Sequence, residues 1–285
     1  FCNKQEELLL PPMPCSKAAG QVVYWVKIAS IKPIGSATVW DIETNPDHNF
    51  FANGVLVHNC KFCANIYHTV TYRSPANIAA EMEHLVRDFD CRAFRLEDDN
   101  LGINASWFNA VCEALPKGIR LKGHVRANLV NDALCQILVK AGFEECGVGV
   151  ESMDNKVLKL VGKGTTAEDN YQAVETLKRH GIRVRAYFIA GLPGETEETV
   201  QKNMEFMRRA RPDKWTLSVF QLYPGCEIRN HPERFGVVVP PSPSFAFQYW
   251  NFAPVAISLN GVSQEVLQER HDRFKAFLKS EEWKD

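Results

Sequence analysis

Hydrophobic positions change their spacing along this chain. Between residues 74 and 222, segments with apolar residues three or four positions apart alternate with short, nearly continuous apolar runs. The first spacing predicts amphipathic helices, and the second predicts strands. The predicted strands are residues 92–96, 120–125, 145–150, 183–190 and 215–222.

Local signals mark where several helices begin and end. Pro75 follows Ser74 at one predicted helix start, because proline suits the first turn. Thr165 and Glu168 form a predicted capping box for a helix that stops at Gly181. The other predicted helices are residues 105–115, 131–141, 195–209 and 264–278.

Strands joined by helical crossovers run parallel, and polar residues gather where these strands end. Glu97-Asp98-Asp99 ends the first predicted strand, and Glu151 ends the third. Polar residues at the carboxyl ends of parallel strands are typical of barrel active sites. We therefore expect an α/β fold, with an α/β barrel or part of one over residues 60–225 and a mixed extension over residues 226–285.

The pattern before residue 60 is different. Residues 21–58 read as β-strands, and Asn53-Gly54 between two apolar runs predicts a hairpin. Residues 1–20 carry a proline-rich kink without a clear period, which is typical of a linker or a remnant. The chain begins with Phe1, so we interpret it as a fragment or a processed product.

Composition narrows the setting. The 285 residues are 45% hydrophobic, with a net charge of −1, which gives no electrostatic case for nucleic acid or a membrane surface. No apolar run reaches the roughly 18 residues of a spanning helix, and no secretory signal is visible. We expect a cytoplasmic protein.

The nine cysteines are too dispersed for a disulfide scaffold and suit a reducing compartment. Four lie among apolar periodic residues, where burial is expected: Cys91, Cys112, Cys135 and Cys146. Cys60 and Cys63 instead form the only CxxC of the chain. A bare CxxC favours a zinc site or a redox pair, but the absence of a second CxxC or paired histidines argues against zinc.

The segment before Cys60 resembles the C-terminal splicing motifs of inteins over about residues 22–60. Asparagine can cyclise and break the following peptide bond, a neighbouring histidine can polarise its carbonyl, and cysteine can accept an acyl group. The resemblance implies that Asn59 cyclises, that His58 and His48 assist, and that Asp41 acts as an acid or base. Cys60 would be the branch-forming nucleophile and the first residue of the downstream extein. No N-terminal splicing half is visible, so this resemblance implies a missing or separately supplied partner segment.

The segment from Cys60 to about residue 226 resembles radical S-adenosylmethionine (SAM) enzymes, which hold a 4Fe–4S cluster on CxxxCxxC. Cys60 and Cys63 match the second and third cysteines, and Phe62 matches the aromatic residue before the third. Leu56 stands where the first cysteine is expected. The intein interpretation accounts for this difference, because the first cysteine would then belong to the missing N-extein. Thiolates suit iron by their softness.

The resemblance implies a SAM site at the strand ends. The acidic residues Glu97, Asp98 and Asp99 would bind the methionyl amine. Arg126 would meet the carboxylate. Glu151 would take the ribose hydroxyls, and Gly191, in Gly191-Leu192-Pro193-Gly194, would lie near adenine.

The resemblance is closest to the cobalamin-associated branch, which includes anaerobic magnesium-protoporphyrin ester cyclase-like enzymes. It implies a partial (β/α)6 barrel without its first strand, a small-molecule substrate and an electron donor such as flavodoxin or ferredoxin. Cobalamin use would depend on a missing N-terminal domain. Two alternatives stay open: a splicing fragment fused to an inactive barrel, and a zinc- or thiol-based barrel protein. The domain prediction is 1–20 linker or intein remnant, 21–59 intein segment, 60–225 radical SAM core and 226–285 extension.

Overall fold

The computed structural model describes residues 49–52, 55–58, 60–63, 72–223, 226–239, 255 and 257–284. The chain divides into two compact units, Phe1–Asp41 and Ile42–Asp285, and every described residue belongs to the second unit. The elements are β1 (Asn49–Ala52), β2 (Val55–His58), α1 (Pro75–Phe89), β3 (Ala93–Arg95), α2 (Ala105–Ala114), β4 (Arg120–Val125), η1 (Ala127–Leu129), α3 (Asp132–Ala141), β5 (Phe143–Glu151), α4 (Asn155–Leu160), α5 (Ala167–Arg179), β6 (Arg183–Ala190), α6 (Glu197–Ala210), β7 (Lys214–Val219), α7 (Glu227–Asn230), η2 (Pro232–Phe235), β8 (Val237–Val238), β9 (Ser258–Leu259), α8 (Gln264–Ser280) and η3 (Glu282–Lys284).

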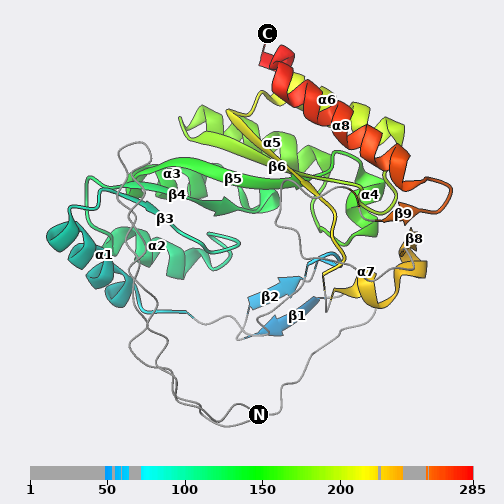
Figure 1. The fold of residues 1–285 in the computed structure, drawn as a ribbon. Coiled ribbons are helices and arrows are strands. Elements are labelled where there is room, and N and C mark those ends of the chain that lie inside the picture. Colours follow the sequence, from blue (N-terminus) through cyan, green and yellow to red (C-terminus); the bar gives the residue numbers. More distant parts are fainter. Residues whose placement is uncertain are drawn as a thin grey trace, which may run out of the picture. The chain divides into compact units, whose positions relative to one another are not determined.

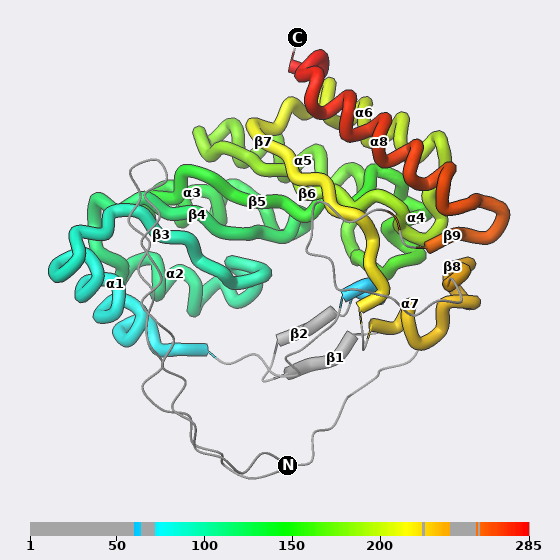
Figure 2. The backbone as a smooth tube through the Cα atoms, in the orientation of Figure 1, coloured from blue at the N-terminus to red at the C-terminus, as the bar shows by residue number. Residues whose placement is uncertain are grey.

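A five-stranded parallel sheet is the centre of the described fold. Its strands follow chain order, β3-β4-β5-β6-β7, and curl into a half-barrel (Figures 1 and 2). The predicted parallel α/β architecture is therefore confirmed. Within the described residues β3 is an edge strand, as expected for a barrel without its first strand.

Helix boundaries follow from side-chain caps. Ser74 accepts a hydrogen bond from the amide of Asn77 and begins α1, as predicted. The predicted capping box of α5 is wrong by one residue. Thr166 is the N-cap, and its partner is Asp169 rather than Glu168, so Thr165 precedes the box. Sequence analysis also missed the short helix α4.

Helices cover one face of the sheet and bury its apolar side chains. On β6, Val184, Ala186 and Phe188 are at most 1% exposed and belong to the main core, which also includes side chains of α5, α6 and α8. Three of the four cysteines predicted to be buried lie in this core: Cys112, Cys135 and Cys146. Cys91 is only partly buried.

A second apolar cluster joins the carboxyl ends of the strands to the extension after residue 226. Val161, Phe220, Ile228 and Leu267 are among its members. The extension thus packs close to the end of the sheet where barrel enzymes carry their sites.

Of the β-structure predicted before residue 60, the structure confirms the hairpin. Strands β1 and β2 pair antiparallel, with Asn49 opposite His58 and Ala52 opposite Val55. The predicted turn residues, Asn53 and Gly54, lie outside the described residues. Asp41, His48, Asn59 and the predicted strands within residues 22–42 lie outside the described residues. Among the described helices, none is long and apolar enough to cross a membrane.

Candidate functional site

The CxxC turn is held by both the barrel and the extension. The amide of Cys63 donates to the carbonyl of Cys60 over 2.9 Å, which closes the turn. Lys61 donates from its amide to the carbonyl of Val161 over 3.0 Å, and its carbonyl accepts from the amide of Ile228 over 3.1 Å. Phe62 packs against the second apolar cluster. These contacts orient a half-buried Cys60 and an exposed Cys63.

Three charged side chains, those of Lys163, Arg126 and Glu151, lie close enough to Cys60 to act on its pKa. Lys163 Nζ lies 2.7 Å from Oε1 of Glu151, and both side chains are nearly buried. Arg126 follows the last residue of β4, and its Nη2 donates to the carbonyl of Lys163. Its buried Nε has no hydrogen-bond partner among the described residues. The arrangement leaves one cationic donor free to bind an anionic group.

Electrostatics tie these groups to the thiols. Burial raises the pKa of Cys60, and the charges of Lys163 and Arg126 partly oppose that rise. For Cys63, desolvation by the surrounding protein atoms is the main cause that raises the pKa to about 11, with smaller contributions from Cys60 and Asp99. Both thiols are therefore protonated at neutral pH, and a bound metal would be needed to favour the thiolates.

Glycines on β5 make room for the side chains that cross it. A Cβ at Gly149 would lie 2.5 Å from Oε1 of Glu151 and 2.8 Å from Nζ of Lys163. A Cβ at Gly147 would lie 2.6 Å from the ring atoms of both His124 and Tyr187. The Gly-Val-Gly-Val-Glu sequence at the end of β5 therefore lets an ion pair and an aromatic pair lie directly over the strand.

Glu151 itself has an uncommon backbone. It is a non-glycine residue with φ of 59°, and the pairing of β5 with β6 shifts register between Gly149 and Glu151. Such a conformation costs about 1 kcal/mol or more for a residue with a Cβ. The strained backbone places the Glu151 carboxylate beside Lys163.

The turn after β6 is organised by a buried carboxylate. Gly191 has φ of 77° and donates from its amide to Oε2 of Glu195 over 2.8 Å. Oε1 of Glu195 has no partner among the described residues. Burial raises the pKa of Glu195 to about 7 against the opposing Gly191 hydrogen bond. The predicted adenine-side turn thus depends on a residue that sequence analysis did not single out.

The structure brings together some of the predicted site residues and not others. Arg126, Glu151, Cys60 and Cys63 form one group, and Asp99 is close enough to influence Cys63. Of the remaining acidic residues, Glu97 instead forms a 3.0 Å ion pair with Arg95, and Asp98 is exposed.

Sequence analysis missed Lys163, the residue that links Glu151 to the cysteine turn. Its only local signal is its place between Gly162 and Gly164, both with positive φ.

The donor set fits part of an iron–sulfur site. Cys60 and Cys63 offer two sulfur ligands on one turn, the donors that iron–sulfur clusters use. No group of three His, Cys, Asp or Glu residues that could hold a metal ion occurs among the described residues. The first cysteine of the predicted motif is not supplied here, because position 56 is a leucine within β2. The described residues therefore supply two of the three cysteine ligands of the predicted motif.

Comparisons with known proteins agree with this geometry. The family model described as the radical SAM superfamily matches residues 57–207. The anaerobic magnesium-protoporphyrin IX monomethyl ester cyclase of Rubrivivax gelatinosus is 28% identical over 242 residues, covering 80% of this chain and 42% of the relative. The bacteriochlorophyllide d C-12(1)-methyltransferase of Chlorobaculum tepidum is 28% identical over 135 residues, covering 46% of this chain and 30% of the relative.

Solved structures show the same fold. The radical SAM methyltransferase TsrM of Kitasatospora setae, with cobalamin and a 4Fe–4S cluster bound, superposes with a TM-score of 0.54 at 21% identity, over 64% of this chain and 36% of TsrM. The chain thus spans less than half the length of these relatives. The family model covers more than half of this chain, and the half-barrel agrees with it. The chain belongs to the radical SAM superfamily.

Proposed function

We propose that the assembled protein binds SAM and a 4Fe–4S cluster and starts radical chemistry on a small-molecule substrate. When bound, the cluster supplies the electron that cleaves SAM to methionine and a 5′-deoxyadenosyl radical. The observation that carries the proposal is a contact group beside the carboxyl ends of β4 and β5. Lys163 contacts both Glu151 and Arg126, and all three residues lie close enough to Cys60 to act on its pKa.

Each residue of this group has a task in the proposal. Cys60 and Cys63 hold two irons of the cluster. The free Nε of Arg126 meets the methionyl carboxylate. Glu151 accepts the ribose hydroxyls, and the Gly191 turn lies beside the adenine. The acidic stretch Glu97-Asp98-Asp99 takes the methionyl amine, for which the proximity of Asp99 to Cys63 is the supporting contact.

Cobalamin and the substrate belong to the same proposal at a coarser level. The names of the two relatives above, a cyclase and a methyltransferase, each contain a tetrapyrrole, and one similar structure contains cobalamin. We propose a cobalamin-associated enzyme whose cobalamin domain lies outside this chain, with flavodoxin or ferredoxin as electron donor. The substrate class by these names would be a tetrapyrrole or a comparable organic molecule.

A second candidate function is splicing at Asn59–Cys60. The observation in its favour is the antiparallel hairpin β1–β2, which runs up to the junction and places Asn49 opposite His58. In this proposal Asp41, His48, His58 and Asn59 catalyse release of the intein segment, and Cys60 joins the N-extein that carries the first cluster cysteine. Cys60 then has two successive roles that exclude each other in time, because each needs its free sulfur.

The test of the enzyme proposal uses the spliced protein, made with its missing N-terminal half and reconstituted anaerobically with iron and sulfide. We expect cluster absorption, SAM binding by calorimetry, and 5′-deoxyadenosine after reduction. Glu151→Ala should weaken SAM binding by about 0.5–1.5 kcal/mol, the value of a lost hydrogen bond. Glu144→Ala, on the same strand but at its other end, is the matched control and should bind normally.

Three outcomes separate the alternatives. Tight zinc binding without a cluster would favour the zinc- or thiol-based barrel. Splicing without SAM binding would favour a splicing segment fused to an inactive barrel. Normal SAM affinity in Glu151→Ala would remove the ribose role. For splicing, mass spectrometry of the precursor supplied with its N-terminal half should show the ligated product for the natural chain and none for Cys60→Ala.

A further inference from the structure

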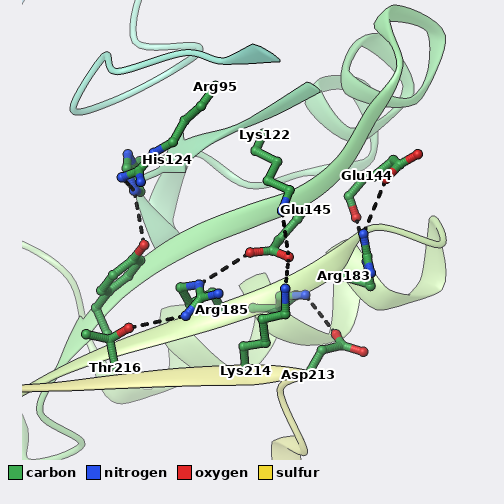
Figure 3. Close-up of polar contacts among 12 residues, drawn as sticks. Arg95, Lys122, His124, Glu144, Glu145, Arg183, Arg185, Asp213, Lys214 and Thr216 are labelled. Carbon is green, nitrogen blue, oxygen red and sulfur yellow. Dashed lines mark hydrogen bonds and ion pairs between the residues drawn. The ribbon is translucent and has the colours of Figure 1, made fainter. Parts of the chain in front are cut away.

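The half-barrel carries a layer of positive charge at the amino end of its strands. Glu145, the third residue of β5, has a side chain only 6% exposed. Three cations from three other strands converge on its carboxylate (Figure 3). Lys214 Nζ lies at 2.6 Å, Arg185 Nε at 3.3 Å and Lys122 Nζ at 3.7 Å. We call Lys122, Glu145, Arg185 and Lys214 the Glu145 layer.

The layer has a surplus of positive charge. Three cations less one carboxylate leave a net charge of +2. Burial alone would raise the pKa of Glu145, but Lys214, Lys122 and Arg185 outweigh burial and hold it below its usual range. Glu145 is therefore ionised at neutral pH, and it can neutralise only one of its three partners.

The surplus charge is accessible. The side chains of Arg185, Lys214 and Lys122 are 30%, 39% and 48% exposed, whereas the carboxylate they surround is buried. One cation is enough to neutralise the buried carboxylate. The two further cations beside it are half-exposed and repel each other. An additional anion in front of the layer would relieve this repulsion.

The next layer along β5 is uncharged and aromatic. The rings of His124 and Tyr187 lie 5.5 Å apart over Gly147, and Tyr187 Oη is 3.2 Å from Nε2 of His124. Arg95 Nη2 also donates to Nε2 of His124, over 3.4 Å (Figure 3). Because arginine can only donate, Nε2 is the acceptor and Nδ1 carries the proton. Burial lowers the pKa of His124, and Arg95 lowers it further.

The proposed cofactor layer follows beyond the aromatic pair. Gly149 lies under the Glu151–Lys163 ion pair. Strand residues rise about 3.3 Å each, so Gly147 and Gly149 lie about 7 Å and about 13 Å beyond Glu145. One face of β5 therefore presents, in order, positive charge, aromatic rings and the group around Cys60.

We propose that the Glu145 layer binds a carboxylate of the substrate, whose reacting carbon extends past His124 and Tyr187 toward the Glu151–Lys163 layer. The substrate class is an extended organic acid with a carboxylate roughly 10 Å from the reacting carbon, a length set by the spacing of the strand residues. The statement that the bound anion belongs to the substrate rests on the proposed function. The anion site itself rests on charge and geometry.

The test is calorimetric titration of the full chain with citrate, a tricarboxylate probe, at constant ionic strength. Triethyl citrate, which has the same skeleton without charge, is the ligand control. Arg185→Gln and Lys214→Met should each weaken citrate binding about fivefold or more, because each removes one attracting charge. Glu145→Gln should tighten binding several-fold, because the surplus rises from +2 to +3.

Arg183→Gln is the matched control variant. Arg183 lies in the same strand as Arg185 but pairs with Glu144 over 3.3 Å, outside the Glu145 layer. Its loss changes the net charge equally and should leave citrate affinity unchanged. Urea unfolding of each variant checks the fold, and both Arg185→Gln and Lys214→Met leave Glu145 with a cation.

Two results would overturn the proposal. One is equal weakening in Arg183→Gln and Arg185→Gln, which would mean that citrate follows total charge. The other is unchanged affinity in both Arg185→Gln and Lys214→Met. Failure of the proposed function looks different, because SAM binding would be absent from the spliced protein while the citrate pattern persists. If both proposals hold, spliced Arg185→Gln should still cleave SAM but lose turnover of an acidic substrate.

Discussion

Replacing Gly149 with alanine should break the Glu151–Lys163 ion pair without removing either charge. The new Cβ would lie 2.5 Å from Oε1 of Glu151 and 2.8 Å from Nζ of Lys163, distances that real Cβ atoms do not tolerate. Both atoms are ends of flexible side chains, so the pair would separate while the strand keeps its course. Gly149 has no positive φ, and its backbone accepts alanine.

The magnitude follows from two opposing effects. At 2.7 Å and an effective dielectric of about 20, the attraction is about 6 kcal/mol. Desolvation of the two ions offsets most of this attraction and leaves a net coupling of about 1–3 kcal/mol. Alanine gains about 0.5–1 kcal/mol over glycine by restricting the unfolded chain. We expect Gly149→Ala to lower the free energy of unfolding by about 1–2 kcal/mol.

The sign should reverse when the pair is absent. In a background of Glu151→Ala with Lys163→Ala, the side-chain ends that clash are gone, so Gly149→Ala should become neutral or stabilising by about 0.5–1 kcal/mol. Urea unfolding at pH 8 measures all four proteins. Burial lowers the pKa of Lys163, but the charge of Glu151 opposes burial and the pKa is raised overall, so the contribution of the ion pair is complete below about pH 10.5. Equal destabilisation in both backgrounds would refute the reasoning.

Three further predictions use the same unfolding assay or a metal analysis. Burial raises the pKa of Glu195 to about 7, so as the pH rises the carboxyl group of Glu195 loses its proton in the unfolded chain before it does so in the folded chain. The free energy of unfolding should therefore fall by about 3 kcal/mol between pH 4.5 and 7. Glu195→Gln should remove this pH dependence, and an unchanged pH dependence would contradict the assignment. Gly142→Ala should cost about 3 kcal/mol or more, because φ is 98° and the Cβ would lie 2.4 Å from the carbonyl oxygen of Ile119; Gly118→Ala, with φ of 75° and no atom within 4 Å, should cost only about 1 kcal/mol, and equal costs would remove the role of the clash. This chain by itself should hold less than one 4Fe–4S cluster after reconstitution, because its CxxC turn offers two cysteine ligands. A full cluster ligated only by Cys60 and Cys63 would contradict the expectation that a further cysteine ligand is needed.

The fold was largely predictable because the strands of the central sheet and the long helices between them carry local signals. The strand over Arg183–Ala190 was predicted to the residue, since Gly181 before it and Gly191 after it limit a run that is rich in β-forming side chains. Errors occurred where the signal is shared between neighbours. Thr165 and Thr166 can both cap a helix, and the structure uses Thr166 because Asp169, not Glu168, reaches back to it.

The site was predictable where residues end strands and was missed elsewhere. Arg126 and Glu151 follow strand runs, so their place at the carboxyl edge could be inferred. Lys163 lies in a loop between two glycines, and its partner is twelve positions earlier in the chain. Its role depends on the φ of 59° at Glu151, which no sequence pattern indicates. Loop residues that act through a distant partner need coordinates to be found.

The order of chemistry along β5 explains why its sequence is so unusual for a central strand. Glycine weakens a strand and is selected only where something must approach the backbone closely. Here two glycines alternate with buried valines, so one face packs into the core while the other remains open for pairs contributed by neighbouring segments. Glu145 lies at one end of this face and pairs with cations from β4, β6 and β7. Glu151 lies at the other end and pairs with Lys163 from the loop after α4. A substrate bound along that face would span from one carboxylate to the other. Replacing Gly147 or Gly149 with a residue that has a side chain should therefore disturb binding on this face more than it disturbs the core.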